Sequence, residues 1–230
     1  MSISPKVRIL FLLIFVLTLF YISSFSYAGA GNFIPEKVRY EGKTYVYAPF
    51  HSQRDRVFEI NLDEEPGNEV FISFAAIPGR DSGKEQFFHF WQILDSGDNG
   101  YEAVQTERSR GLPGEVYFKD LNSDGEKEIF VFTTGYGQYL RLAVYSYREG
   151  RYVNIWEGES ICGIKLELEA TPPVIKVASS SWGGKVIDEE GRQLDWCFAA
   201  EPLYAVYAWE DNNFLYNEQK SNYEPLKSLR

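Results

Sequence analysis

Two stretches of this chain share one pattern, and that pattern limits the fold more than any other feature of the sequence. Residues 61–72 read NLDEEPGNEVFI and residues 120–131 read DLNSDGEKEIFV, and the two align without a gap at an offset of 59 residues. In both, oxygen-bearing side chains occupy the first, third, fifth and ninth places, and an apolar run follows. Because β-branched and aromatic runs flank each acidic segment, the repeat predicts strand–loop–strand units.

The same rhythm extends into longer units. Strand, acidic loop, strand, link, strand, turn and strand follow one another at about residues 56–108, 115–157 and 163–218. Four short antiparallel strands per unit are typical of the blade of a propeller. We therefore predict an all-β, propeller-like fold in one domain over residues 31–230, with an N-terminal hairpin within residues 38–47.

Three units leave the closure of the array open, because closed propellers use about four to eight blades. The hairpin within residues 38–47 supplying part of a fourth unit, an open array of three sheets, and closure by a second chain are all compatible with the sequence.

The loop of the second unit carries the donor set of a cation site. Hard oxygen ligands without His or Cys favour calcium or magnesium, and an irregular acidic loop suits calcium better. The loop is not an EF-hand, because the twelfth residue is Val131 where a closing Glu is required, and because a strand rather than a helix follows. A solvated acidic turn without an ion is the alternative. The predicted ligands are Asp120, Asn122, Asp124 and Glu128, with the backbone carbonyl of Glu126.

The loop of the first unit is a weaker candidate for the same ion. Pro66 stands where the second loop has its bend glycine, Gly125, and Glu65 is longer than the matching aspartate. Both changes favour the alternative, a site that has lost its ion. Its candidate ligands are Asn61, Asp63, Glu65 and Glu69.

The segment DLNSDGEKEIFV resembles the calcium loop of FG-GAP repeats, also called VCBS or integrin-α-like repeats. That family has D-x-D-x-D-G-x-x-D followed by an aliphatic residue, between the first two strands of a propeller blade. Here Asn122 and Glu128 replace two of the family's aspartates, and both keep an oxygen ligand. The resemblance implies a blade-type unit stabilised by calcium and a role in recognition or adhesion, and it covers about a dozen residues.

The N-terminus reads as a secretory signal peptide over residues 1–30. Lys6 and Arg8 precede an apolar run, and the A-x-A end predicts cleavage after Ala30, with Ala28 as the alternative site and an uncleaved anchor as the alternative fate. Cleavage leaves 21 basic and 33 acidic residues, a net charge of −12. We therefore expect a periplasmic or secreted protein that does not bind nucleic acid and is not stably inserted in a membrane after cleavage.

Two cysteines and two tryptophans complete the candidate residues. An oxidising compartment favours a disulfide between Cys162 and Cys197, with two buried thiols as the alternative. Trp182, next to Gly183, and Trp196 lie in an insertion of the third unit, and we expect them to contact a partner unless the insertion only covers a sheet edge.

No catalytic motif stands out. The sequence has no G-x-S-x-G elbow, H-E-x-x-H helix, P-loop or nucleotide fingerprint, and its histidines are His51 and His89. We expect an exported, calcium-stabilised module for protein or glycan recognition. The alternative is an extracytoplasmic hydrolase or lyase acting on polysaccharide or peptidoglycan.

Overall fold

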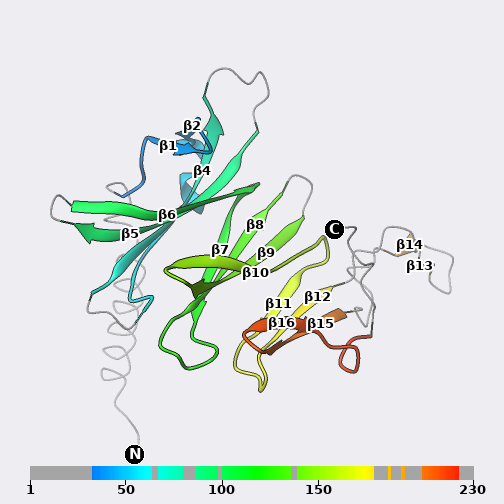
Figure 1. The fold of residues 1–230 in the computed structure, drawn as a ribbon. Coiled ribbons are helices and arrows are strands. Elements are labelled where there is room, and N and C mark those ends of the chain that lie inside the picture. The colour runs from blue at the N-terminus through cyan, green and yellow to red at the C-terminus, as the bar shows by residue number, and fades with distance from the viewer. Residues whose placement is uncertain are drawn as a thin grey trace, which may run out of the picture.

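The fold is a row of antiparallel sheets, each built from strands that follow one another along the chain (Figure 1). The computed structural model describes residues 33–63, 67–79, 86–97, 100–135, 139–178, 186–187, 193–194 and 204–222. No helix in this part of the chain has the length and apolar character needed to span a bilayer. The row of antiparallel sheets confirms the predicted all-β, propeller-like fold class.

Sheet 1 combines the N-terminal hairpin with the first meander. Its strands are β1 (Lys37–Tyr40), β2 (Lys43–Tyr47), β3 (Arg56–Ile60), β4 (Glu69–Pro78), β5 (Phe88–Gly97) and β6 (Gly100–Arg110). The predicted hairpin is confirmed as β1 and β2. It joins sheet 1 and does not begin a fourth sheet, because β2 pairs with β4.

The long strand β4 holds two different strands on one edge. β3 pairs along Glu69–Ser73, and β2 pairs along Ala76–Pro78. Between them, the Ala48 amide donates to the Ala75 carbonyl at 2.9 Å, which continues the ladder across the gap. The short 3₁₀ helix η2 (Pro49–Arg54) carries the chain from β2 to β3. The hairpin therefore completes the edge that β3 leaves half covered.

Sheets 2 and 3 are four-stranded meanders. Sheet 2 contains β7 (Leu112–Lys119), β8 (Glu128–Thr134), β9 (Leu140–Arg148) and β10 (Arg151–Ser160). Sheet 3 contains β11 (Ile164–Glu167), β12 (Val174–Ala178), β15 (Tyr204–Glu210) and β16 (Asn213–Tyr216). A two-stranded ribbon of β13 (Val186–Ile187) and β14 (Gln193–Leu194) lies between β12 and β15 in the chain.

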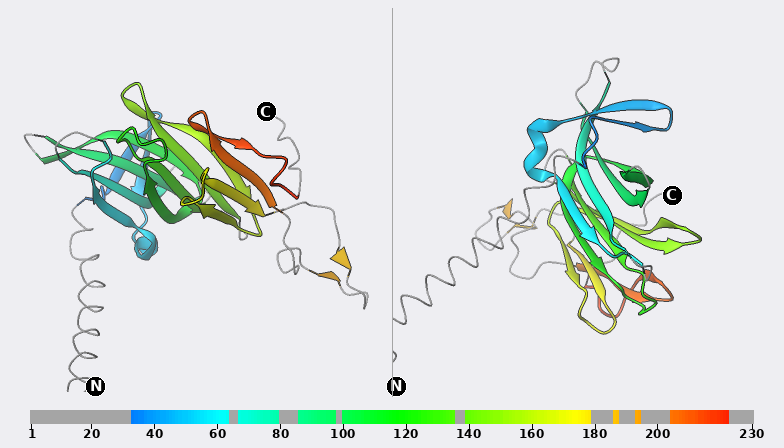
Figure 2. Two further views of the ribbon diagram at one scale, coloured as in Figure 1. Left: turned by 90° about the horizontal axis from the view of Figure 1, so that it is seen from below. Right: turned by 90° about the vertical axis from the view of Figure 1, so that its left-hand side faces the viewer.

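Hydrophobic layers between the sheets hold the row together, and Figure 2 shows the sheets following one another in chain order. Phe71 and Trp91 of sheet 1 pack in one cluster with Ile129 and Tyr145 of sheet 2. A second cluster joins Phe130 and Trp156 of sheet 2 to Ile175 and Phe214 of sheet 3. Because successive residues of a strand point to opposite faces, Ile129 and Phe130 serve different layers, and β8 is buried on both sides.

The outer face of sheet 1 has its own core. Val38 and Tyr45 of the hairpin pack there against Ile72, Phe74 and Phe90. Burial of a large apolar side chain contributes about 1.5–3 kcal/mol. The hairpin is therefore an integral part of the fold and not an appended arm.

Candidate functional site

The acidic loop between β7 and β8 is a tight turn organised by Asp120. Its carboxylate accepts the amide of Ser123 at 2.7 Å through Oδ1 and the amide of Gly125 at 3.1 Å through Oδ2. Ser123 and Gly125 have φ values of 61° and 92°, so the backbone reverses within a few residues. Glycine accepts this left-handed conformation without a Cβ penalty, which explains the residue at position 125.

The next two polar side chains continue the turn. Asn122 Oδ1 accepts the Asp124 amide at 3.3 Å, and Asp124 Oδ1 accepts the Glu126 amide at 2.9 Å. Asn122 Nδ2 also donates to Asp124 Oδ2 at 2.7 Å. The alternate spacing seen in the sequence thus gives a succession of side-chain oxygens wrapped around one loop. A carboxylate has about four lone-pair sites, so accepting an amide leaves capacity for a cation.

Glu128 closes the loop from inside the protein. Its side chain is 2% exposed, Oε2 accepts the Leu121 amide at 2.9 Å, and Oε1 accepts the Ser146 hydroxyl at 3.2 Å. The pKa of Glu128 is raised to about 7, mainly by burial and to a smaller extent by the nearby charge of Asp124, and these hydrogen bonds oppose the rise. The loop therefore presents one carboxylate whose charge is poorly solvated.

The loop between β3 and β4 repeats this arrangement in part. Glu69 Oε2 accepts the Leu62 amide at 2.7 Å, the counterpart of the contact between Glu128 and Leu121. Asn61 Nδ2 donates to the Gly67 carbonyl at 2.8 Å. The two loops that align in sequence thus share the same hydrogen bond, from the amide of the second residue to the glutamate at the ninth place. Glu65 lies outside the described residues.

The two loops lie against each other. The Lys127 amide donates to the Leu62 carbonyl at 2.9 Å, and Lys127 Nζ donates to the Asn61 carbonyl. Tyr152 lies beside both loops, with its hydroxyl 3.4 Å from the Leu62 carbonyl. The pKa of Tyr152 is raised, mainly by burial and then by the carboxylates of Glu126, Asp63, Glu69 and Glu128. One side of the array therefore carries a concentrated negative field.

The residues of the Asp120 loop have the ligand chemistry that calcium prefers, but their carboxylates are not already arranged as a metal site. Within the described residues, no three His, Cys, Asp or Glu side chains converge so as to hold a metal ion. The donors around Asp120 nevertheless are all hard oxygens, which calcium prefers. A calcium shell here would draw on the Asn122 side chain and the Glu126 carbonyl in addition to carboxylates.

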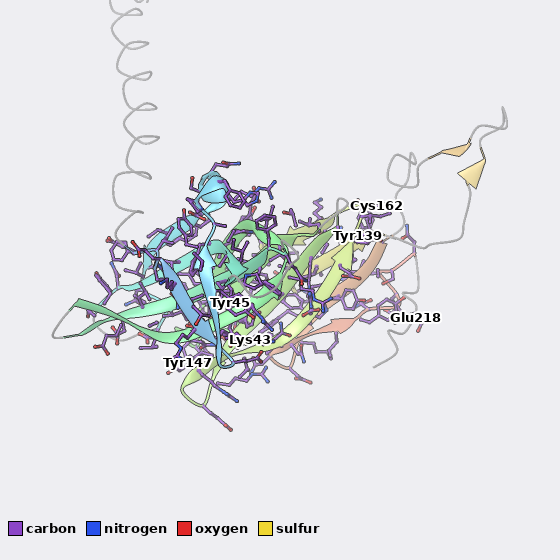
Figure 3. All side chains as sticks on the ribbon, turned by 90° about the horizontal axis from the view of Figure 1, so that it is seen from above. Lys43, Tyr45, Tyr139, Tyr147, Cys162 and Glu218 are labelled. Atoms are coloured by element: carbon purple, nitrogen blue, oxygen red, sulfur yellow. The ribbon has the colours of Figure 1, made fainter. Side chains whose placement is uncertain are left out.

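The remaining predicted residues are placed only in part. Cys162 is disulfide-bonded, and Figure 3 shows it on the side of the molecule occupied by sheet 3. Cys197, Trp182 and Trp196 lie outside the described residues. The pairing of Cys162 with Cys197 and the contact role of the tryptophans stay predictions.

His89 lies buried between two serine hydroxyls, an arrangement that sequence reasoning missed. Its Nε2 lies 2.8 Å from Ser73 Oγ, and its Nδ1 lies 3.1 Å from Ser109 Oγ. Burial lowers the pKa of His89 to about 3. The neutral imidazole provides hydrogen-bond partners for the two serine hydroxyls. Its lowered pKa disfavours the imidazolium that a histidine acting as a general base must form. The aromatic run FFHFW around His89 is the sequence signal that could have indicated its burial, but it does not identify its partners.

A polar groove between sheets 1 and 2 was also missed. It encloses about 1350 Å³, and its lining includes Arg108 and Arg110 of β6 and Arg141 of β9. No local motif marks these residues, because pairing and packing of distant strands bring them together.

In comparisons with protein-family models, curated proteins and solved structures, the chain matches none of them.

Proposed function

We propose that this chain is an exported recognition module whose propeller-like sheets are stabilised by calcium at the loop from Asp120 to Glu128. Its partner is a protein or a glycan outside the cytoplasm. A row of rigid sheets with loops gathered on one side suits recognition, because binding residues are usually displayed on loops that a scaffold positions. The FG-GAP-like spacing of the loop supports the same class of function.

The observation that carries the calcium proposal is the polarity of the loop. Asp120, Asn122 and Asp124 present oxygens at alternate positions of one turn, and Glu128 brings a buried carboxylate to its base. Burying a charge without a partner is costly. Calcium would supply the compensating charge and tie the end of β7 to the start of β8. In the first loop Lys127 already contacts the backbone at Asn61, which supports a weaker need for an ion there.

Calcium titration followed by thermal unfolding tests this proposal. An ion that binds only the folded state adds about 2.7 kcal/mol at a hundredfold excess over Kd. For a domain of this size that corresponds to a rise in Tm of about 5–10 °C. We expect Asp124→Ala to abolish most of the rise.

Asp63→Ala is the matched control, because it removes one carboxylate from the first loop. We expect it to retain most of the calcium-dependent rise in Tm. An Asp124→Ala protein that responds to calcium as the parent does would contradict the assignment.

The alternative function is an extracytoplasmic hydrolase or lyase acting on polysaccharide or peptidoglycan. The observation that favours it is the Ser109 hydroxyl, which lines the groove and contacts His89. Among the described residues, however, the ring nitrogens of His89 contact two serines and no carboxylate that would stabilise an imidazolium. Turnover of a glycan or peptidoglycan panel by the pure protein, and its loss in Ser109→Ala, would establish the enzyme instead.

A further inference from the structure

The strand β6 is the outer strand of sheet 1, and the groove between sheets 1 and 2 runs along its edge. Within the described chain β6 pairs with β5 alone, and Arg108 and Arg110 of β6 belong to the groove lining. The lining also includes Tyr45, from the cluster on the outer face of sheet 1, and Tyr145, from the layer between the two sheets. A groove that reaches both faces of sheet 1 passes along this edge. Gln105, whose side chain bonds to the backbone of β10, marks the end of the open stretch.

The register of β5 and β6 shows which backbone groups point out from this edge. The Gly111 amide donates to the Phe87 carbonyl at 3.4 Å, so these two residues form a hydrogen-bonded pair. Antiparallel pairs alternate between hydrogen-bonded and non-hydrogen-bonded, and the register is regular from here to Thr106. The amides and carbonyls of Thr106, Arg108 and Arg110 therefore point away from β5. Among the described residues, none of these backbone groups makes another hydrogen bond.

An edge of this kind selects a peptide. Each outward residue offers one backbone donor and one backbone acceptor. Extended peptides bind sheets by adding a strand to such an edge, where main-chain hydrogen bonds supply affinity. A saccharide has no amide groups that repeat at the spacing of a strand, so it satisfies these groups less completely.

The charge along the edge selects an acidic peptide. The chain carries a formal net charge of −10, yet the described lining of the groove holds four cationic side chains and one carboxylate. The cations are Lys43, Arg108, Arg110 and Arg141, and the carboxylate is Glu157. Arg108 and Arg110 are two residues apart, so their side chains lie on one face of the sheet. Opposite charges on directly opposed residues of neighbouring strands stabilise the pair, and like charges destabilise it. A strand with acidic residues two apart therefore fits this edge, and a basic strand does not.

Arg108 is already held in place for such a contact. Its guanidinium lies 5.1 Å from the ring centre of Tyr40 and 5.0 Å from that of Phe88. It also donates to the Tyr45 hydroxyl and to Glu41. A guanidinium has five N–H donors, so these bonds leave donors for a ligand carboxylate. A side chain that is already ordered loses less entropy when a ligand binds.

Two further cations are available at the same edge. Among the described residues, neither Lys43 nor Arg110 makes an ion pair or a side-chain hydrogen bond, and both are exposed. Figure 3 shows Lys43 together with Tyr45 on the hairpin. The edge thus combines one preset guanidinium with two unpaired charges.

We propose that the outer edge of β6, over residues 106–110, binds an extended acidic segment of a partner protein. The segment adds to sheet 1 as a further strand and places carboxylates two residues apart beside Arg108 and Arg110. This inference rests on the proposed recognition function and names the kind of partner and the surface.

Calorimetric titration of the pure protein with capped synthetic peptides in calcium-free, low-salt buffer tests the charge and its spacing. The peptide TETETET has glutamates two apart, TEETTTE has the same composition with no two glutamates two apart, and TQTQTQT has no charge. We expect TETETET to bind, the other two to bind at least about tenfold more weakly, and binding to weaken with added salt.

Methylation of the peptide backbone separates strand addition from charge attraction alone. In a strand added to β6, the amides of alternate residues face β6 and the others face away. TETETET is therefore methylated on the amide nitrogens of either its glutamates or its threonines. We expect one of the two methylated peptides to lose binding and the other to keep it. Equal retention or equal loss in both would overturn strand addition.

Reversal of one charge tests the surface. Arg110→Glu should bind TETETET at least tenfold more weakly, which corresponds to about 1.4 kcal/mol, and should bind TKTKTKT more tightly than the parent does. The matched control is Arg151→Glu, which makes the same change at an exposed position outside the groove lining and should bind as the parent does. Circular dichroism and the calcium-dependent rise in Tm check that both variants fold.

Equal binding of the three unmethylated glutamate and glutamine peptides, or no binding of any, would overturn the proposal, as would equal losses in the two variants. Tighter binding of a galacturonate hexasaccharide than of TETETET would overturn the peptide assignment in favour of a glycan. A normal calcium-dependent rise in Tm in a protein that binds none of these probes would overturn this inference while leaving the calcium proposal standing.

Discussion

Replacing Gln105 with leucine tests how strongly a single side chain couples sheets 1 and 2. Its Nε2 donates to the Tyr152 carbonyl at 2.7 Å, and its Oε1 accepts the Tyr152 amide at 2.8 Å. The Gln105 side-chain amide thus bonds to both backbone groups of Tyr152 on the outer edge of β10, as a neighbouring strand would. Tyr152 is 5% exposed, so its backbone groups have little access to water if the side-chain amide is removed.

The expected cost follows from these two bonds. A hydrogen bond contributes about 0.5–1.5 kcal/mol net, so losing two costs about 1–3 kcal/mol. We expect Gln105→Leu to lower the free energy of unfolding by about 2 kcal/mol and Tm by about 4–8 °C. Gln105→Asn should cost a similar amount, because the shorter side chain keeps the amide but does not reach Tyr152.

Urea unfolding measures the effect as a shift in the midpoint at an unchanged slope. Gln53→Leu is the control, because Gln53 is exposed on η2 and surface substitutions usually change stability by less than about 0.5 kcal/mol. If Gln105→Leu and Gln105→Asn both unfold at the same urea concentration as Gln53→Leu, the bridge does not couple the sheets and the reasoning is refuted.

Two further predictions concern titration and the disulfide. Burial raises the pKa of Asp55 to about 6 although the Tyr47 hydroxyl donates to it, so its protonation favours the folded state. This contribution is fully present below the unfolded pKa of about 3.9 and is lost as pH rises to about 6. Asp55→Asn should remove that pH dependence and raise the free energy of unfolding at pH 7 by about 1 kcal/mol, a figure reduced for solvent screening. Melting curves of the parent and the variant from pH 4 to 8 test this. A variant whose Tm depends on pH as the parent's does would contradict it. Mass spectrometry without reduction should find the Cys162 and Cys197 peptides linked, whereas two alkylatable thiols in exported protein would reject the pairing.

Local pattern predicted the strands better than their arrangement. The β-branched and aromatic run after the acidic loop predicted a strand there, and the structure has β8 at Glu128–Thr134. The hairpin within residues 38–47 was equally visible, because Gly42 and the alternating residues around it mark a tight turn. Its pairing with β4 was not, since the edge it covers lies about 30 residues away and no local rule selects that partner.

The acidic loop could be predicted from the sequence, whereas the groove could not. Asp120, Asn122 and Asp124 lie within one turn, so their spacing alone indicated that their oxygens would surround one loop. Arg108 and Arg141 come from different sheets, and their approach depends on how β6 packs against sheet 2. Such a site follows from long-range packing, which one sequence does not display.

The divided edge of β4 has a consequence for how the protein avoids self-association. A chain shortened to begin at β3 would keep the pairs along Glu69–Ser73 but leave the backbone of Phe74–Pro78 uncovered on one side. It would also uncover Phe74 and Phe90, which Tyr45 and Val38 now shield. An unpaired apolar strand edge is a template for addition of another chain. The N-terminal hairpin therefore occupies that edge in competition with any other strand, and loss of the hairpin would open the edge to pairing with another chain.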